Sequence, residues 1–510
     1  MKEDSRYIEF CDTTLRDGEQ TAGVSFNAGE KFTIAKMLLN ELKVDRLEVG
    51  SARVSEGEHQ ALARICSWAT QNDCLNKIET LGFIDNELSI NWIYEAGGRV
   101  VNLLSKGSMK HLTLQLRKTR EQHVEDILRV VDLATSKGMS VNIYLEDWSN
   151  GMRESEEYVY FLVDSLKSSP IRRFMLPDTL GILNPDTTFD YISRMRKRYP
   201  DLHFDFHGHN DYDLAVANSM AAVKAGVDGL HVTVNGLGER TGNTPVASVV
   251  AMLNDHLHLP NSVDEGKLSR ACKYVESISG VRIPSNKPIV GDVVFTQAAG
   301  VHADGDSKGG LYQSALSPER FGRERQYALG KTSGKANVAK NLELLGIQLS
   351  PDHLKLVSDR IVELGDRKEL VTKEDLPFII SDVLKGEFSR GEEKIKVINY
   401  SLQSTRKMRP VAVIRISIDG EEYEEVSSGA GQYDAFMKAL WKVYDKLGRK
   451  HPVLADYTVS IPPGGKTDAL VQTTITWSWK GENIRTRGLD ADQTEAAIKA
   501  TVKMLNLIEE

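Results

Sequence analysis

Cysteine is scarce in this sequence of 510 residues, which contains only Cys11, Cys66, Cys74 and Cys272. Their spacings form neither a paired metal-binding pattern nor a disulfide framework, so a reducing compartment, the cytoplasm, is the expected setting. Long apolar runs are also missing, because no stretch approaches the roughly 18 apolar residues that a membrane-spanning helix needs. The N-terminal MKEDSRYIEF has no apolar signal core. We therefore expect neither secretion nor membrane insertion.

An excess of positive charge is absent as well. The 64 basic and 72 acidic residues give a net charge of −8, which provides no general attraction to nucleic acid or to anionic membranes. The content of 41% hydrophobic and 27% charged residues is typical of a folded globular protein. A (β/α)₈ barrel uses only about 250 residues. At least two folded units are therefore expected.

Residues 1–275 are predicted to form a catalytic (β/α)₈ barrel. Eight short β-rich runs are each followed by a stretch with helical periodicity, which is the pattern of strands and helices alternating around a parallel sheet. Eight such units favour closure into a barrel, because a doubly wound open sheet more often has about five to seven strands. The runs are YIEFCD (7–12), VDRLEVG (44–50), KIETLGF (77–83), VVNLLSK (100–106), SVNIYLE (140–146), RRFMLPD (172–178), HFDFHGH (203–209) and GLHVTVN (229–235).

The rest of the chain divides into two regions. Residues 276–390 lose the alternation and combine loop-rich segments with helical patterns, so we expect a mostly helical linker. The charged, Gly-containing segment KGEFSRGEEK (385–394) is predicted to be a hinge, with a domain boundary near Gly391. Residues 391–510 hold a weak repeat of paired strand-like runs, a Gly-containing turn and an amphipathic helix, beginning at VAVIRISIDG (411–420) and again at LVQTTITWSWKG (470–481). The repeat predicts a pseudo-symmetric α+β domain, for which dimerisation is the simplest role.

Two histidines mark a candidate metal site in the barrel. His207 and His209 are two residues apart on a predicted strand, so both side chains point to the same face. A single inward histidine is more often structural, but two at this spacing beside a carboxylate such as Asp17 favour a divalent-metal site with open coordination positions. Non-haem iron oxygenases use the same ligand types. The spacing alone therefore leaves the chemistry open.

Longer motifs narrow the choice of family. The segments DTTLRDGEQTAGVSF (12–26), FHGHND (206–211), NGLGERTGN (235–243), GVHADG (300–305) and IPPGGKTDA (461–469) span nearly the whole chain. Together they resemble the family of metal-dependent barrel enzymes that contains 2-isopropylmalate, homocitrate and citramalate synthases. A lyase of the hydroxymethylglutaryl-CoA type would carry a reactive cysteine in the loop after strand eight, and GLGERTGN has none.

The resemblance implies a Claisen condensation of acetyl-CoA with a small 2-oxo acid, dependent on a divalent ion such as Mn, Mg or Zn. By position, the family's metal ligands match Asp17, His207, His209 and Asn243, and its catalytic residues match Arg16, Glu146 and His302. The hydroxyl that holds the substrate carboxylate matches Thr179. The acetyl-CoA contacts match Asp304, Leu311 and Tyr312. His302 lies outside the barrel, and in the family this histidine reaches the site from the partner subunit, which implies a homodimer.

Alternative roles exist for two of these residues. Arg16 is equally able to pair structurally with Asp17 or Glu48, and Glu146 to serve as a structural carboxylate at a strand end. An alternative hypothesis from a different functional class is that the chain is a metal-binding or effector-sensing protein that has lost catalysis. The presence of Arg16, Glu146 and His302 together argues against that reading.

The choice of 2-oxo acid depends on three strand ends. Leu81, Leu104 and Tyr144 stand at the positions that resemble the pyruvate-using members of the family, where bulky groups leave room only for a methyl. As ordinary core residues they would mean little. The substrate-binding set is then Arg16, Asp17, Leu81, Leu104, Tyr144 and Thr179. The product would be citramalate, on a route to isoleucine, and the alternative is condensation with 2-oxoisovalerate on the route to leucine.

The same resemblance assigns a regulatory role to residues 391–510. If pyruvate is the substrate, the domain is expected to bind an amino-acid effector, isoleucine, as feedback inhibitor. The positions that match the effector pocket of the family are Tyr433, Asp434, Leu454, Tyr457, Ile461, Thr467, Val471 and Gln493.

Overall fold

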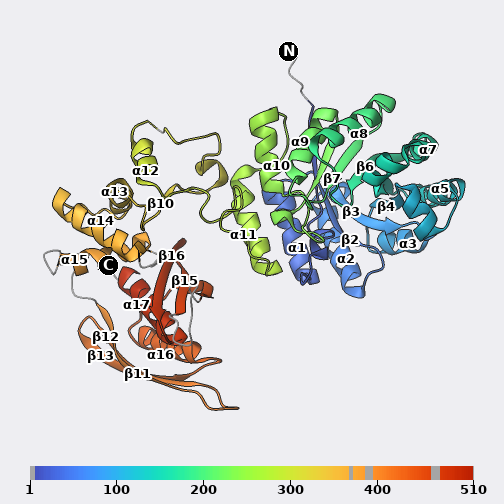
Figure 1. Ribbon diagram of the computed structural model, residues 1–510. Helices are drawn as coiled ribbons and strands as arrows, with labels where there is room; N and C mark the ends of the chain where they lie inside the picture. Colours follow the sequence, from blue (N-terminus) through green and yellow to red (C-terminus); the bar gives the residue numbers. More distant parts are fainter. Residues whose placement is uncertain (1–5, 310, 367–370, 385–393, 461–470, 509–510) are drawn as a thin grey trace. The chain divides into compact units, whose positions relative to one another are not determined.

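The computed structural model describes residues 6–309, 311–366, 371–384, 394–460 and 471–508 (Figure 1). These form two compact units, one built from Met1–Thr296 and Gln313–Arg325 and the other from Gln297–Tyr312 and Gln326–Glu510. The predicted hinge around Gly391 lies outside the described residues, except for its last residue.

The first unit contains a closed barrel of eight parallel strands that follow one another in chain order. Each of the eight predicted runs overlaps one of them, and β8 returns to pair with β1, with Cys11 opposite His231. The predicted (β/α)₈ fold is confirmed. The strands are β1 (Glu9–Asp12), β2 (Arg46–Ser51), β3 (Ile78–Phe83), β4 (Val100–Lys106), β5 (Ser140–Glu146), β6 (Ile171–Asp178), β7 (Phe204–Gly208) and β8 (Gly229–Val232).

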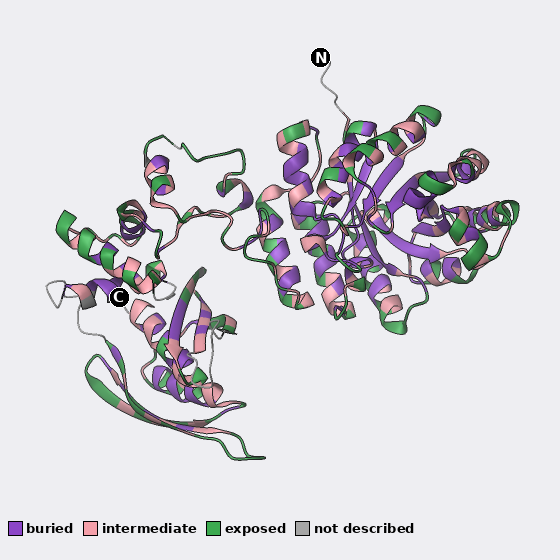
Figure 2. Ribbon diagram, viewed as in Figure 1, coloured by how far each residue is buried: buried purple, intermediate pink, exposed green. Residues whose placement is uncertain are grey.

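Helices cover the outside of the barrel, so the strands are buried on both faces, as Figure 2 shows. Helix α5 illustrates why the sequence folds this way: Thr119 and Gln122 form a capping box, and Ile127, Val130 and Ala134 repeat at the spacing of one helical face and are buried. The helices of this unit are α1 (Ala28–Lys36), α2 (Glu56–Gln71), α3 (Leu88–Glu95), α4 (Met109–His111), α5 (Arg120–Ser136), α6 (Trp148–Glu154), α7 (Glu156–Leu166), α8 (Pro185–Arg198), α9 (Ala215–Ala225), α10 (Val246–Met252) and α11 (Leu268–Ser279).

The segment after the barrel is mostly helical, as expected. Its helices are α12 (Gly300–Ser307), α13 (Lys335–Leu344), α14 (Pro351–Asp366) and α15 (Leu376–Val383), and two short strands, β9 (Thr296–Gln297) and β10 (Gln326–Tyr327), pair beside them. A small separate core that includes Val357, Ile361 and Ile380 holds the helices together.

The C-terminal domain consists of two copies of the same arrangement, three antiparallel strands followed by one helix. Both predicted repeats are present, and each has one strand more than predicted, β11 or β14. These two strands contribute few buried apolar residues, and β11 is mostly exposed, although the alternation in IKVINYSLQ (395–403) could have identified β11. The elements are β11 (Ile395–Gln403), β12 (Val411–Ile418), β13 (Glu421–Ser428) and α16 (Gln432–Lys446), then β14 (Val453–Ser460), β15 (Val471–Trp479), β16 (Glu482–Asp490) and α17 (Gln493–Ile508). Both helices contribute to one shared core.

All four cysteines are unpaired. Burial raises the pKa of the Cys66 and Cys272 thiols to about 12, so these groups are unreactive packing residues. None of the described helices combines the length and apolar character that crossing a membrane requires.

One lysine of the barrel is buried although it belongs to a helix on the outside. The ammonium group of Lys31 on α1 contacts the carboxylates of Glu19 at 2.6 Å and Glu58 at 2.5 Å. The same nitrogen donates to the carbonyl oxygen of Leu15 at 3.0 Å. Leu15 and Glu19 belong to the loop after β1, and Glu58 belongs to α2. Lys31 therefore joins this loop to a neighbouring helix.

Replacing Lys31 with Met is expected to lower the free energy of unfolding by about 3–5 kcal/mol, because two largely buried carboxylates lose their cation. The matched control is Lys36→Met, at an exposed position of the same helix, which should change stability by less than about 0.5 kcal/mol. Denaturant unfolding followed by circular dichroism measures both variants. Equal stability of the two would show that the buried ion pairs do not hold the loop.

Candidate functional site

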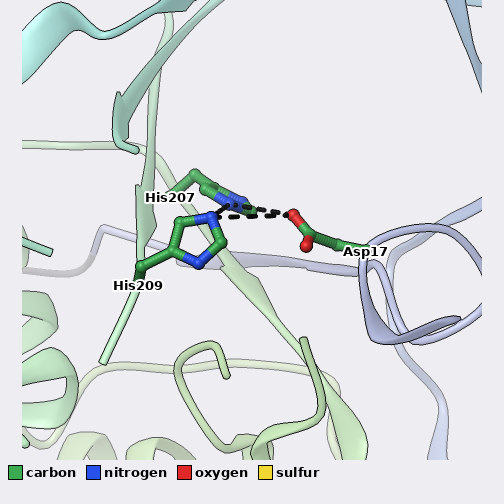
Figure 3. A group of neighbouring side chains, drawn as sticks. All are labelled: Asp17, His207 and His209. Atoms are coloured by element: carbon green, nitrogen blue, oxygen red, sulfur yellow. Dashed lines mark hydrogen bonds and ion pairs between the residues drawn. The ribbon is translucent and has the colours of Figure 1, made fainter. Parts of the chain in front are cut away.

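Three potential metal ligands meet at the end of the barrel where the strands finish. Asp17 follows β1, His207 lies on β7, and His209 comes directly after that strand. Nε2 of His207 is 3.2 Å from Oδ2 of Asp17 and 3.4 Å from Nε2 of His209. The ligand atoms of the three side chains all lie within 4.8 Å of one another and are buried (Figure 3). The sequence-based pairing of the two histidines with Asp17 thus corresponds to a compact cluster.

Burial and neighbouring charges set the protonation of this cluster. Burial alone would raise the pKa of Asp17, but the Arg16 guanidinium and a hydrogen bond with His207 hold that pKa well below its ordinary value. Burial lowers the pKa of His207, and burial together with His207 lowers the pKa of His209 to about 4. Near pH 7 the site therefore has one carboxylate and two neutral imidazoles, which is the state that a divalent cation needs in its ligands.

The donor set fits a divalent ion. Oδ1 of Asp17 and both Nδ1 atoms are buried without a hydrogen-bond partner among the described residues. A buried carboxylate oxygen without a partner is costly unless a cation or water satisfies it. Two imidazoles and one carboxylate also suit zinc, manganese and iron chemically. The residues present can therefore hold a metal, and they do not select one element.

Asn243 lies beside this cluster. It follows β8 and forms an isolated antiparallel bridge with His209. Its amide nitrogen donates to the carbonyl oxygen of Leu237 at 3.1 Å, while its own Oδ1 is buried with no partner among the described residues. This oxygen is available as a further ligand.

Arg16 is the central residue of the site. Its Nε donates to Glu48 at 2.6 Å, its Nη1 to Asp17 at 2.9 Å and its Nη2 to the hydroxyl of Tyr144 at 3.1 Å. Both structural pairings that the sequence suggested for Arg16 are present. They use two of the five N–H donors, and Tyr144 uses a third, so two donors remain for a substrate oxygen.

The pocket residues predicted from three strand ends lie together. Leu81, Tyr144 and Met175 form one small buried cluster, and Leu104 packs against it. Met175 on β6 was missed in the sequence, although it occupies the matching inward position of the run RRFMLPD. Because Tyr144 also contacts Arg16, this apolar wall lies next to the guanidinium. The arrangement suits a ligand with a carboxylate or ketone at one end and a small apolar group at the other.

A buried polar chain supports Tyr144 from inside the barrel. Its hydroxyl lies 3.0 Å from Nδ1 of His231, whose Nε2 lies 3.3 Å from Asp205. Asp205 in turn accepts a hydrogen bond from Arg46 at 2.6 Å. Burial, followed by the charge of Glu48, raises the pKa of Tyr144 well above its ordinary value, so the hydroxyl stays protonated. Neither His231 nor Asp205 was predicted as part of the site, because nothing in their local pattern distinguishes them from structural polar residues.

Glu146 and Thr179 lie at the ends of adjacent strands. Glu146 closes β5 and forms an ion pair with Lys106 on β4. The hydroxyl of Thr179 accepts a hydrogen bond from the backbone N–H of Asp147 at 2.9 Å. Each side chain is partly exposed, so both remain accessible to a ligand.

Four predicted residues belong to the second unit. The ring of His302 on α12 packs against that of Tyr312, with centroids 4.2 Å apart. Asp304 pairs with Lys308, and Leu311 is exposed. Their predicted roles toward the barrel site stay predictions.

The C-terminal domain contains a cavity of about 850 Å³ between α16, β14, β15 and the start of α17. Five of the eight predicted effector residues line it: Tyr433, Asp434, Leu454, Tyr457 and Gln493. Val471 lies on β15 outside the lining, and Ile461 and Thr467 lie outside the described residues. The aromatic rings of Tyr433 and Tyr457 are 5.5 Å apart. We call this cavity the effector pocket.

Comparison with known proteins agrees with this architecture. Three family models match successive parts of the chain: HMGL-like over residues 7–275, homocitrate synthase post-HMGL domain-like over residues 289–369, and the LeuA allosteric (dimerisation) domain over residues 370–509.

Two relatives resemble nearly the whole chain. The (R)-citramalate synthase CimA of Methanocaldococcus jannaschii is 32% identical, over 98% of this chain and 99% of its own length. A probable 2-isopropylmalate synthase of Methanopyrus kandleri is 34% identical, over 98% of each chain. The names of the relatives thus refer to two different products.

The grouping of Asp17, His207 and His209 predicts that the protein binds a divalent metal ion. After chelation and dialysis against Mn²⁺ or Zn²⁺, the protein should retain about one ion per chain, and His209→Ala should bind it at least about a hundredfold more weakly, because a direct ligand matters at least as much as its supporting residues. His256→Ala, which removes an exposed histidine, is the control. Elemental analysis measures bound metal. Equal retention by both variants would contradict a metal site at His209.

Proposed function

We propose that this chain, which belongs to the HMGL-like family and, by its full-length relatives, to the citramalate and 2-isopropylmalate synthases, condenses acetyl-CoA with pyruvate. The family supports the general reaction, transfer of an acetyl group to a 2-oxo acid with formation of a carbon–carbon bond. The choice of pyruvate is the proposal.

The observation that supports pyruvate is the apolar wall beside Arg16. Leu81, Tyr144 and Met175 are buried against one another and Leu104 packs on them. Tyr144 of this cluster accepts a hydrogen bond from Arg16, and we propose that the four side chains border the position of the oxo acid's apolar group. A methyl group needs little room there, whereas an isopropyl group requires at least one of them to move. Because interiors are closely packed, such a movement is costly.

The proposed reaction is balanced with water as the only further reactant. A base removes a proton from the methyl carbon of acetyl-CoA, and the resulting carbanion equivalent bonds to the ketone carbon of pyruvate. The ketone oxygen takes up a proton, and water cleaves the thioester to release coenzyme A and a second carboxylate. The product is citramalate. Hydrolysis of the thioester makes the overall condensation irreversible.

Each step has a candidate side chain. The two remaining N–H donors of Arg16 bind the oxo-acid oxygens, where they stabilise negative charge that develops on the ketone. Thr179 holds the substrate carboxylate through its hydroxyl. Glu146 and His302 are proposed for proton transfer, since a histidine suits general-base chemistry near neutral pH. A divalent cation held by Asp17, His207, His209 and Asn243 would supply Lewis-acid polarisation of the substrate oxygens.

The second candidate is 2-isopropylmalate synthesis from 2-oxoisovalerate. One full-length relative carries that name, and the reaction would use the same Arg16 and metal cluster. In this proposal the apolar wall is the feature that discriminates between pyruvate and 2-oxoisovalerate.

Further proposals concern assembly and control. The match to an allosteric dimerisation domain supports a homodimer, in which His302 acts on the barrel of the partner subunit. Asp304, Leu311 and Tyr312 are proposed acetyl-CoA contacts on the same segment. The effector pocket, with Asp434 for an ammonium group and an apolar interior around Leu454 and Tyr457, is proposed to bind isoleucine as a feedback inhibitor.

Substrate choice is tested with two adjacent leucines of β4. Leu104 faces the pocket wall, whereas Leu103 is buried in the main barrel core. Leu104→Ala should raise kcat/KM for 2-oxoisovalerate relative to pyruvate by about 10–200-fold, the range available from one hydrophobic contact. Leu103→Ala should cost about 2–5 kcal/mol of stability without changing that ratio. Release of free thiol with each oxo acid measures activity. If the unaltered protein already uses 2-oxoisovalerate more efficiently than pyruvate, the 2-isopropylmalate alternative replaces the proposal.

A shared active site is tested by mixing inactive chains. In a dimer of one Arg16→Ala chain and one His302→Ala chain, one of the two sites has both residues intact, so random mixing should restore about a quarter of the original activity. Mixing Arg16→Ala with Asp17→Ala chains, both altered in the barrel, should restore none. Thiol release after subunit exchange measures the recovery. No recovery in verified mixed dimers would contradict the action of His302 across the interface.

A further inference from the structure

We infer that the C-terminal domain holds a second binding site for a small aliphatic amino acid, in a cavity that the internal repeat makes equivalent to the effector pocket. The inference rests on the proposed function of the effector pocket as an amino-acid site. It adds a second occupant per chain, at a place that the sequence analysis did not identify.

The second cavity has a volume of about 620 Å³ and lies between β11 and α17. Its lining includes Val397 and Tyr400 from the strand, and Ile498, Lys499 and Val502 from the helix. Apolar and charged side chains thus border the same space. We call this cavity the second pocket.

Helix α16 of the effector pocket and helix α17 of the second pocket can be aligned residue by residue without an insertion or deletion. Gln432 begins α16 and Gln493 begins α17, 61 positions later. The same offset relates Met437 to Ile498 and Lys438 to Lys499, and all four of these side chains line their cavities.

Two further helical positions follow the same rule. Asp434 in the effector pocket corresponds to Glu495 in the second pocket, and Trp441 corresponds to Val502. The acid and the lysine of each helix are four residues apart, so they lie one turn from each other on the same side.

The strands correspond as well. β11 has a register shift between Val397 and Asn399 in its pairing with β12, and β14 has one between Leu454 and Asp456 in its pairing with β15. Aligning these irregularities places Tyr400 at the position of Tyr457, and each tyrosine lines its own cavity. The helix alignment and the strand alignment therefore each indicate, independently, that the second pocket is equivalent to the effector pocket.

The chemistry of the second pocket suits a zwitterion with an aliphatic side chain. Glu495 supplies a carboxylate for an ammonium group, and it accepts a hydrogen bond from the hydroxyl of Tyr400. Lys499 supplies a cation for a carboxylate. It pairs with Asp490 at 2.6 Å at a partly exposed position, and such exposed pairs contribute little stability, so a ligand carboxylate can compete for the lysine.

The two pockets differ in their apolar interior. The effector pocket has four aromatic rings, those of Tyr433, Trp441, Tyr457 and Trp477, whereas the second pocket has one, Tyr400, beside aliphatic groups, with Val502 in the place of Trp441. The second cavity is also the smaller one, about 620 Å³ against about 850 Å³. A compact branched side chain suits this interior better than an aromatic one.

The second pocket also has a contact that its counterpart lacks. Lys503, which lines it, forms an ion pair at 2.9 Å with Asp375, just before α15 in the linker. The equivalent lysine of the first repeat, Lys442, donates to the carbonyl oxygen of Val426 within the C-terminal domain. Lys503 therefore connects the lining of the second pocket to the linker.

The test is the number of amino-acid molecules bound by the full chain. Isothermal titration with L-isoleucine should give two molecules per chain, and glycine, which lacks an aliphatic side chain, should bind at least about tenfold more weakly. Lys438→Ala and Lys499→Ala are a matched pair, because both lysines are about half exposed and occupy equivalent positions. Each should weaken one of the two binding events by about tenfold or more and leave the other unchanged.

Val502→Trp provides a second variant that fills the second pocket with the side chain of its counterpart, and it should remove the same binding event as Lys499→Ala. One molecule per chain, weakened by Lys438→Ala alone, would overturn the second site and leave the effector pocket supported. Two molecules per chain, both unaffected by Lys499→Ala, would overturn it too. If no amino acid binds, the effector proposal falls as well, while thiol release with pyruvate on the same preparation tests the condensation separately.

Discussion

The guanidinium of Arg16 is the point on which the barrel site depends. It joins a candidate metal ligand, Asp17, to the pocket wall at Tyr144 and to a buried carboxylate, Glu48. A buried cation of this kind is stable only when its anions are held in place, and the anions are stable only because it is there. The same contacts keep Asp17 ionised as a ligand. The candidate metal site, the proposed oxo-acid site and the packing of the barrel interior thus share one electrostatic arrangement.

Buried polar contacts continue from this arrangement into the barrel interior. A hydrogen-bonded chain runs through the interior from Arg46 and Asp205 through His231 to Tyr144. Each of these four side chains has a partner from a different strand, which holds the tyrosine ring against the apolar wall. If the apolar wall selects the oxo acid as proposed, that selection depends also on the residues that hold Tyr144 in place.

The fold and the pair of histidines in the candidate metal site were predictable because both follow from local patterns. Alternating strands and helices gave the barrel, and His207 and His209 share a face by their spacing. Partners from distant segments were harder to identify. Lys31 has the pattern of an exposed helical residue yet is fully buried, and Met175 is one apolar residue among many on β6 until the barrel closes. The pairing of Glu48 with Arg16 was considered as an alternative to catalysis, whereas the geometry makes it part of the same site.

The anchoring of the loop after β1 limits how far its motif can be moved between proteins. The segment that carries Arg16 and Asp17 takes its shape from Lys31 on α1 and, through that lysine, from Glu58 on α2. An engineer who grafts the short motif alone into another barrel would transfer the functional groups without their orientation. The smallest portable module is the whole stretch from β1 to α2, about one quarter of a (β/α)₈ barrel.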